Sequence, residues 1–221
     1  MESVNVFIRD FLAVYFLMVG IYYTSRSLGL YERSRFSYIN YGQPGSSTWW
    51  HRHLFNIFRA AILIVCAIGV VFDVQAYLGM FPALVNPFLN LTGVFFLLVS
   101  LGLISFFHSF MGEEWRSGID DRKGKLITFG PYARTRNPMF MAIILGQLGF
   151  FLTLPCVFTL VCLIVGASVI IRQARQEEIA LEKLYGDAYR SYRDRVPRWI
   201  PRRLPATEGT NDAESFRNAQ Q

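Results

Sequence analysis

The chain has 221 residues, of which 52% are hydrophobic and only 17% are charged, and its mean hydropathy is positive. The apolar residues occur in long blocks, which is typical of a small membrane protein with several spans and excludes an ordinary soluble domain. The formal net charge is +6, but the basic residues border the apolar blocks and do not line a polar face. Membrane orientation therefore explains this charge better than nucleic-acid binding does.

The apolar blocks predict an all-α, multi-pass membrane protein with about five transmembrane helices. They cover approximately Val4–Tyr23, Leu54–Leu78, Phe88–Met111, Met139–Leu154 and Pro155–Ile171. Arg9 and Asp10 lie inside the first block, where they can partly offset each other, and no small-residue cleavage site is visible, so we expect a retained span and not a signal peptide. The last two blocks are short for a span and almost contiguous, so we expect them to form a tight helical hairpin.

Polar segments between the blocks set the expected orientation. Residues 24–53 form a polar loop, and together with residues 112–137 and the C-terminal region they carry nearly all Lys and Arg. The positive-inside rule then places the N-terminus outside and the C-terminus in the cytosol. Arg59 lies in the first turns of the second block, where its charge is costly unless the side chain pairs or extends to the interface.

Three regions follow from this organisation. Residues 1–111 hold three spans, residues 112–201 hold the polar connector, the apolar hairpin and the last helix, and the polar tail 202–221 is expected to be disordered. Within the second region, an amphipathic charged helix is expected from Arg172 to about Arg195. Cys66, Cys156 and Cys162 lie inside apolar blocks without paired spacing, and we interpret them as small buried residues.

The stretch from Phe129 to Phe140 is a cationic, hydrogen-bonding turn at the start of an apolar block. It contains Tyr132, Arg134, Arg136 and Asn137 between Pro131 and Pro138. Each proline fixes its own φ angle and biases the preceding residue away from helix, and Pro138 suits the first turn of the helix that follows. Two interpretations remain open, a positively charged stop at the end of a span or one half of a ligand site.

A pair of carboxylates, Glu177 and Glu178, follows the last apolar block. Arg175 could form simple solvated helix pairs with Glu178 or Glu182. Alternatively, a carboxylate here could meet the turn at 130–138 and accept hydrogen bonds from a ligand's hydroxyl groups, as carboxylates do in dinucleotide sites.

Together the two stretches resemble the membrane methyltransferase family that includes isoprenylcysteine carboxyl methyltransferases and their bacterial, phospholipid-methyltransferase-related relatives. The family's first motif, Gly-Xaa-Tyr and then Arg-His-Pro-Xaa-Tyr, is matched by Gly130-Pro131-Tyr132 and Arg136-Asn137-Pro138-Met139-Phe140. The second motif is matched by Glu177-Glu178, Leu181, Leu184-Tyr185-Gly186-Asp187, Tyr189, Tyr192 and Val196-Pro197. Trp115-Arg116-Ser117-Gly118 resembles a feature of the bacterial branch, and the resemblance as a whole covers roughly residues 112–201.

The resemblance implies an S-adenosylmethionine-dependent methyltransferase whose cofactor binds at the cytosolic face and whose lipophilic substrate enters from the bilayer. By this resemblance residues 112–201 would form the cofactor-binding half, and residues 1–111 would lie on the side of the substrate cavity. The resemblance favours the bacterial inner membrane over the endoplasmic reticulum. We expect no metal, because Cys/His spacing typical of a zinc site is absent, and no nucleic-acid partner. The acceptor group could be a carboxylate, a thiol or a lipid headgroup. The residues that would bind the cofactor are Leu126, Gly130, Tyr132, Asn137, Pro138, Phe140, Glu177 and Glu178.

The resemblance also implies roles for three arginines. Arg136 would pair with the cofactor carboxylate or brace Glu178, and Arg172 and Arg175 would orient the acceptor group. Two departures bear on the chemistry, because Asn137 replaces the family's usual histidine and Phe140 replaces its usual tyrosine. An asparagine can donate and accept hydrogen bonds but cannot act as a base near neutral pH, so we expect position 137 to bind and align.

Two other classes of protein remain as alternatives. Membrane sterol reductases that bind NADPH contain a related Arg-His-Pro-Xaa-Tyr turn, although they are usually longer and lack the Glu-Glu ending in this form. A non-enzymatic accessory or transport protein could use the cationic turn only as a topology signal.

Overall fold

The computed structural model describes residues 2–34, 43–112 and 126–200, so the expected disordered tail and the match at Trp115–Gly118 lie outside the described residues. Every regular element of the described part is a helix. In chain order, these elements are α1 (Glu2–Ser34), α2 (Ser47–Val71), η1 (Gln75–Tyr77), η2 (Pro82–Leu84), α3 (Pro87–Met111), η4 (Gly130–Ala133), α4 (Pro138–Thr153), α5 (Val157–Tyr185) and α6 (Asp187–Arg195). The expected all-α class is confirmed.

Four helices are long and apolar enough to cross a bilayer, namely α1, α2, α3 and α5. The fifth apolar block forms α4, a shorter helix of 16 residues. These helices indicate an integral membrane protein with several spans, as the sequence predicts. The ion pair expected inside α1 is present, since Arg9 Nε lies 3.2 Å from Asp10 Oδ1.

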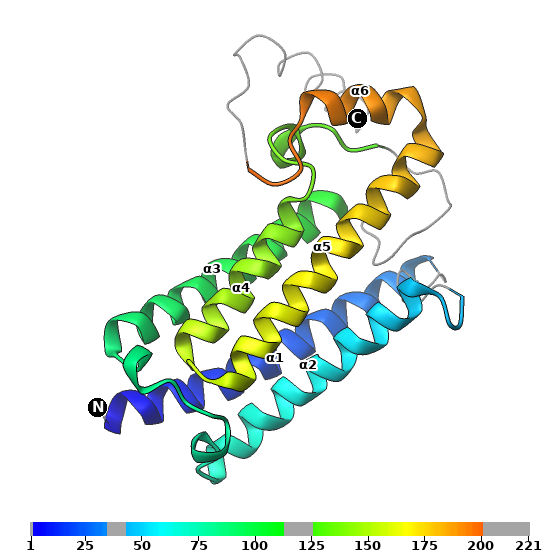
Figure 1. The fold of residues 1–221 in the computed structure, drawn as a ribbon. Coiled ribbons are helices and arrows are strands. Elements are labelled where there is room, and N and C mark those ends of the chain that lie inside the picture. The colour runs from blue at the N-terminus through cyan, green and yellow to red at the C-terminus, as the bar shows by residue number, and fades with distance from the viewer. Residues whose placement is uncertain (1, 35–42, 113–125, 201–221) are drawn as a thin grey trace.

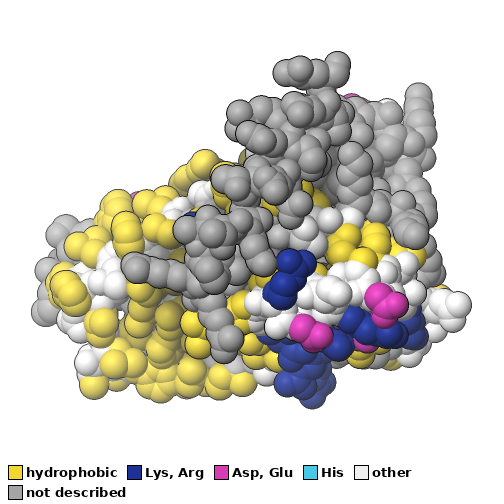
Figure 2. Space-filling view, turned by 90° about the horizontal axis from the view of Figure 1, so that it is seen from above, with side chains coloured by type: hydrophobic (Ala, Val, Ile, Leu, Met, Phe, Trp, Pro, Cys, Tyr) yellow, Lys and Arg dark blue, Asp and Glu magenta, His cyan; other side chains and the backbone are white. Residues whose placement is uncertain are grey.

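The helices form two groups that lie side by side. α3, α4 and α5 pack against one another in sequence order, and α1 pairs with α2 (Figure 1). α2 contacts α5 and α1 contacts α3, which joins the two groups. Above the long helices, α6 and η4 lie together at one end of the molecule (Figure 1). In the view from above, onto the end that carries α6, basic and acidic side chains gather on one side, and mostly apolar side chains lie next to them (Figure 2).

Small residues allow α3 and α4 to approach closely. A Cβ on Gly93 would collide with the backbone nitrogen of Thr153, and a Cβ on Gly149 would lie 2.9 Å from the Gly93 carbonyl oxygen. The contact is strengthened by hydrogen bonds, because Ser100 Oγ donates to the Ala142 carbonyl (2.7 Å). Lipid gives helices little hydrophobic reason to associate, so close packing and interhelical hydrogen bonds carry this contact.

Two expected boundaries differ from the structure. α1 continues to Ser34, so the polar loop expected at 24–53 is partly helical. The single helix expected from Arg172 to about Arg195 is divided at Gly186, where φ is +56° and its N–H bonds to the Glu182 carbonyl (2.9 Å). Glycine adopts this left-handed conformation without the steric cost of a Cβ. The break turns α6 back over the end of the bundle (Figure 1).

We expect Gly93→Ala to lower the free energy of unfolding by about 1–3 kcal/mol, because overpacking forces the close α3–α4 contact apart. Gly102→Ala is the matched control in the same helix, since a Cβ there meets nothing within 4 Å. The control should be neutral or stabilising, as alanine favours helix over glycine. Thermal unfolding in detergent measures both, and equal melting temperatures would contradict the packing argument.

Candidate active site

The turn at the end of the bundle is held between α3 and α6. Gly130 has φ +60°, and a Cβ there would lie 2.6 Å from the Phe110 ring, so glycine is required for both conformation and space. The Tyr132 ring stacks on Phe110, and its hydroxyl donates to Met111 Sδ (3.0 Å). The Tyr192 hydroxyl of α6 donates to the Tyr132 carbonyl oxygen (2.8 Å). The backbone of η4 is therefore fixed from both sides.

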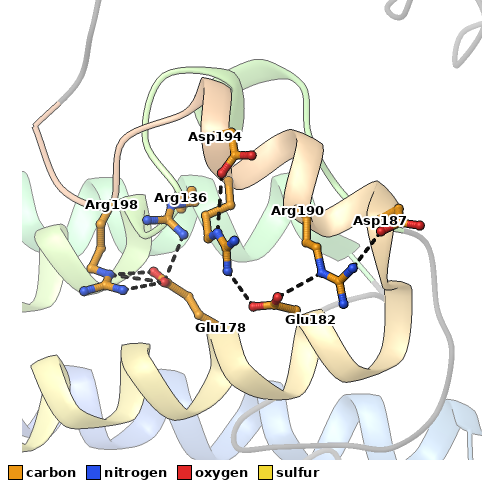
Figure 3. Close-up of polar contacts among 8 residues, drawn as sticks. Arg136, Glu178, Glu182, Asp187, Arg190, Asp194 and Arg198 are labelled. Carbon is orange, nitrogen blue, oxygen red and sulfur yellow. Dashed lines mark hydrogen bonds and ion pairs between the residues drawn. The ribbon is translucent and has the colours of Figure 1, made fainter.

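Glu178 of α5 lies at the centre of a buried ion cluster (Figure 3). Arg136 Nη1 lies 2.9 Å from Glu178 Oε2, and these two side chains are only 9% and 8% exposed. Arg198 donates from Nε to Oε1 (3.0 Å) and from Nη2 to Oε2 (2.8 Å), which is a two-point contact. Asn137 Nδ2 adds a hydrogen bond to Oε1 (3.0 Å). Both carboxylate oxygens are thus bound by protein donors, as a buried charge requires.

The segment after α6 is bound to the same turn through its backbone. The Arg136 N–H donates to the Pro197 carbonyl (3.0 Å). The Arg198 carbonyl accepts from Thr135 Oγ1 (3.1 Å) and from Asn137 Nδ2 (3.3 Å). Asn137 therefore connects Glu178 to the C-terminal segment by using both hydrogens of its amide.

Arg198 is a site residue that the sequence reasoning missed. It directly follows Val196-Pro197, with which the second motif ends. The available signal was an arginine beside that Val-Pro pair, because a buried carboxylate with one arginine partner needs further donors. Hydrogen bonding to Glu178 raises the pKa of Arg198, so it stays charged.

The interpretation of Glu178 and Glu182 as solvated partners of Arg175 is wrong. Glu178 pairs with Arg136 and Arg198, whereas Glu182 Oε2 accepts from Arg193 Nη1 (2.6 Å) and its Oε1 accepts from Arg190 Nε (3.1 Å). The pairing across elements arises because the break at Gly186 brings α6 back over α5.

Arg172 and Arg175 are exposed and do not line the cavity beneath the turn. Successive helical residues are about 100° apart, so Arg172 lies on the face of α5 opposite to the buried Ala174 and Glu178, and Arg175 lies at the edge of that buried face. The resemblance implies that these two arginines orient the acceptor group. In the structure they lie outside the cavity lining.

Beneath the turn lies a cavity of about 860 Å³ whose lining comes from α1 to α6 and from the turn. Seven of the expected site residues line it, namely Leu126, Tyr132, Arg136, Asn137, Phe140, Glu177 and Glu178. Gly130 and Pro138 do not; they shape the turn and the start of α4. Toward the long helices the wall is mainly apolar, with Phe16, Leu97, Ile104 and Phe150 among its residues.

Three tyrosines around the turn, of which Tyr189 and Tyr192 are fully buried, remain neutral at physiological pH. Burial raises the pKa of Tyr132, and the nearby Glu177 carboxylate acts in the same direction. Burial and Glu178 raise the pKa of Tyr189 to about 12, against the opposing influence of Arg136. The pKa of Tyr192 is also raised, first by burial and then by Tyr189. These phenols can therefore donate hydrogen bonds but cannot act as bases near pH 7.

The long apolar helices and this cavity define an integral membrane protein with a small-molecule site at one end of its bundle. Residues 83–188 match the family model described as phospholipid methyltransferase. This part of the chain therefore belongs to that family, which is the family of isoprenylcysteine carboxyl methyltransferase-like membrane methyltransferases. Comparison with curated proteins and with solved structures gave no significant match. The matched span includes α3, the turn, the α4–α5 hairpin, Glu177 and Glu178.

We expect Glu178→Gln to lower the free energy of unfolding by about 3–5 kcal/mol, because it leaves Arg136 buried without its counter-charge. Glu182→Gln is the matched control on the same helix. Its side chain is 31% exposed, so loss of its ion pairs should cost no more than about 1 kcal/mol. Thermal unfolding of the two variants in one detergent compares them, and a similar loss in both would contradict the buried cluster.

Proposed function

We propose that the protein is an S-adenosylmethionine-dependent methyltransferase that acts on a lipophilic acceptor. The observation that carries the proposal is the overlap between the methyltransferase domain at 83–188 and the cavity. Both the turn and the carboxylate pair of that domain line the same space, which continues between apolar helices. A water-soluble cofactor would enter at the end that carries α6, the cytosolic end by the positive-inside rule, and the acceptor would enter from the bilayer.

The cavity suits such a ligand pair in size and chemistry. Its volume of about 860 Å³ lies within the range of small-molecule sites, which is roughly 300–1,000 Å³. Tyr132 and Phe140 offer aromatic faces to an adenine ring or to a sulfonium cation. Glu177 offers a carboxylate for ribose hydroxyls.

The two carboxylates have different roles in this proposal. Glu178 is held by Arg136, Asn137 and Arg198, so its task is to fix the turn against α5. Glu177 lines the cavity, receives a hydrogen bond from Gln173 (2.9 Å) and lies close enough to Tyr132 to raise the pKa of that tyrosine. We therefore assign the cofactor contact to Glu177 and the positioning role to Glu178.

When bound, the cofactor supplies an electrophilic methyl group on a sulfonium, which an acceptor in line with the carbon–sulfur bond can take. The chain's own residues then need mainly to align two ligands and exclude water, because proximity and orientation lower the barrier of such a displacement. The buried cluster makes the turn rigid, and the apolar helices keep water from the acceptor end. Since Tyr132, Tyr189 and Tyr192 stay protonated, they can orient ligands but not deprotonate them. An acceptor that is already anionic fits this site best.

Binding of radiolabelled S-adenosylmethionine to the purified protein tests the proposal. We expect saturable binding by the wild type and a roughly ten-fold or greater loss of affinity in Glu177→Gln, because a hydrogen bond to a charged group contributes about 1.5–3 kcal/mol. Glu182→Gln, the same change five residues further along α5, should bind like the wild type.

The same assay separates the competing classes of protein. A sterol-reductase-like oxidoreductase would be stabilised against heat by NADPH and not by S-adenosylmethionine. An accessory or transport protein would be stabilised by neither. Absence of S-adenosylmethionine binding in two different detergents would reject the methyltransferase.

A further inference from the structure

Arg59 is a cation in the apolar part of α2 that lines the cavity. Its guanidinium lies 4.9 Å from the centre of the Tyr23 ring, so it contacts an aromatic face of α1. Within the described ranges 2–34, 43–112 and 126–200, no carboxylate forms an ion pair with it. An arginine in a membrane span is costly without a partner and commonly marks a ligand path.

The carboxylates of the cavity are engaged elsewhere. Glu178 is bound by Arg136 and Arg198, and Glu177 accepts from Gln173. These contacts form around the turn, whereas Arg59 belongs to the α1–α2 pair on the other wall. One wall of the cavity thus holds a closed ion cluster, and the other holds a cation that, among the described residues, contacts an aromatic ring and forms no ion pair.

A series of ring contacts places Arg59 near the turn and not at the far end of the cavity. The Tyr23 ring lies 5.5 Å from the ring of His108, between ring centres, and His108 belongs to the last turn of α3. Met111, one turn further along, accepts the hydrogen bond from Tyr132. Away from these residues the cavity continues between apolar side chains of α1, α3 and α4.

We propose that Arg59 binds the anionic group of the lipophilic substrate, whose apolar tail lies between the two helix groups. The proposal rests on the methyltransferase function proposed above and specifies the charge of its substrate. The planar guanidinium presents several donors in a fork that matches a carboxylate or a phosphate. Contact with Tyr23 engages the face of this fork and restricts its orientation, and among the described residues its N–H edges remain available to a ligand.

A pair of fluorescent fatty-acid probes tests this proposal. cis-Parinaric acid and its methyl ester have the same tail and differ only in charge when the pH is alkaline enough to ionise the acid. We expect the wild type, in a neutral maltoside detergent without phospholipid, to bind the acid about ten-fold or more tightly than the ester. In Arg59→Gln this preference should be lost, while affinity for the ester is unchanged.

Two further variants complete the test. Arg9→Gln is the matched control in a neighbouring span, and its arginine is already paired with Asp10, so the preference for the acid should remain. Arg59→Lys keeps the charge but lacks the planar fork, and it should retain part of the preference. If Arg59→Gln does not fold, the comparison of Arg59→Lys with the wild type still tests the proposal, because a smaller preference for the acid over the ester supports the role of Arg59.

Failure of this proposal is distinct from failure of the proposed function. Equal binding of acid and ester by the wild type, or an undiminished preference in both Arg59 variants, would overturn the role of Arg59. Binding of S-adenosylmethionine would stand in either case. The opposite result is also possible: the protein could prefer the acid through Arg59 and yet not bind S-adenosylmethionine. That result would reject the methyltransferase function and retain the anion site.

Discussion

The structure around the candidate site depends on one buried carboxylate, that of Glu178. Glu178 joins three separate segments, because Arg136 comes from the turn, Arg198 comes from the segment after α6, and Glu178 itself belongs to α5. Removing a carboxylate from water costs several kcal/mol, and only complete hydrogen bonding offsets this cost. Here both oxygens are bound, and Asn137 supplies a further donor. The turn can therefore be irregular and still rigid, as a ligand site requires.

The ion cluster forms only because the chain reverses twice. The α4–α5 hairpin returns the chain to the level of the turn, and the left-handed Gly186 sends α6 back across it. The reversal brings Tyr189, Tyr192 and Val196 into one apolar cluster, with Leu126, Leu181 and Tyr185 packed against it. This apolar cluster keeps water away from the ion cluster around Glu178. The electrostatic interactions of the ion cluster are stronger as a result.

Sequence reasoning predicts the features that depend on local composition. Long apolar blocks give the spans, prolines mark the turn, and the short link between the last two blocks gives the hairpin. From the residues alone, the nearness of the turn to the carboxylate pair is one of two open interpretations, and only the family resemblance favours it. Arg198 was missed because its contact depends on where α6 reverses, and helical periodicity does not reveal a break at Gly186. Arg172 and Arg175 do not line the cavity, because nearness in sequence does not determine which face of α5 meets it.

The charges on the two walls of the cavity constrain how the proposed ligands can occupy it together. A sulfonium cofactor is cationic, and Arg59 adds a second positive charge to the same weakly polar space. Like charges repel, and apolar walls increase the repulsion, so cofactor and Arg59 would oppose each other in the absence of a substrate. An anionic substrate group between them removes this repulsion. On this argument the anion favours cofactor binding and the cofactor favours the anion, and the two ligands bind with positive cooperativity as reciprocal linkage requires.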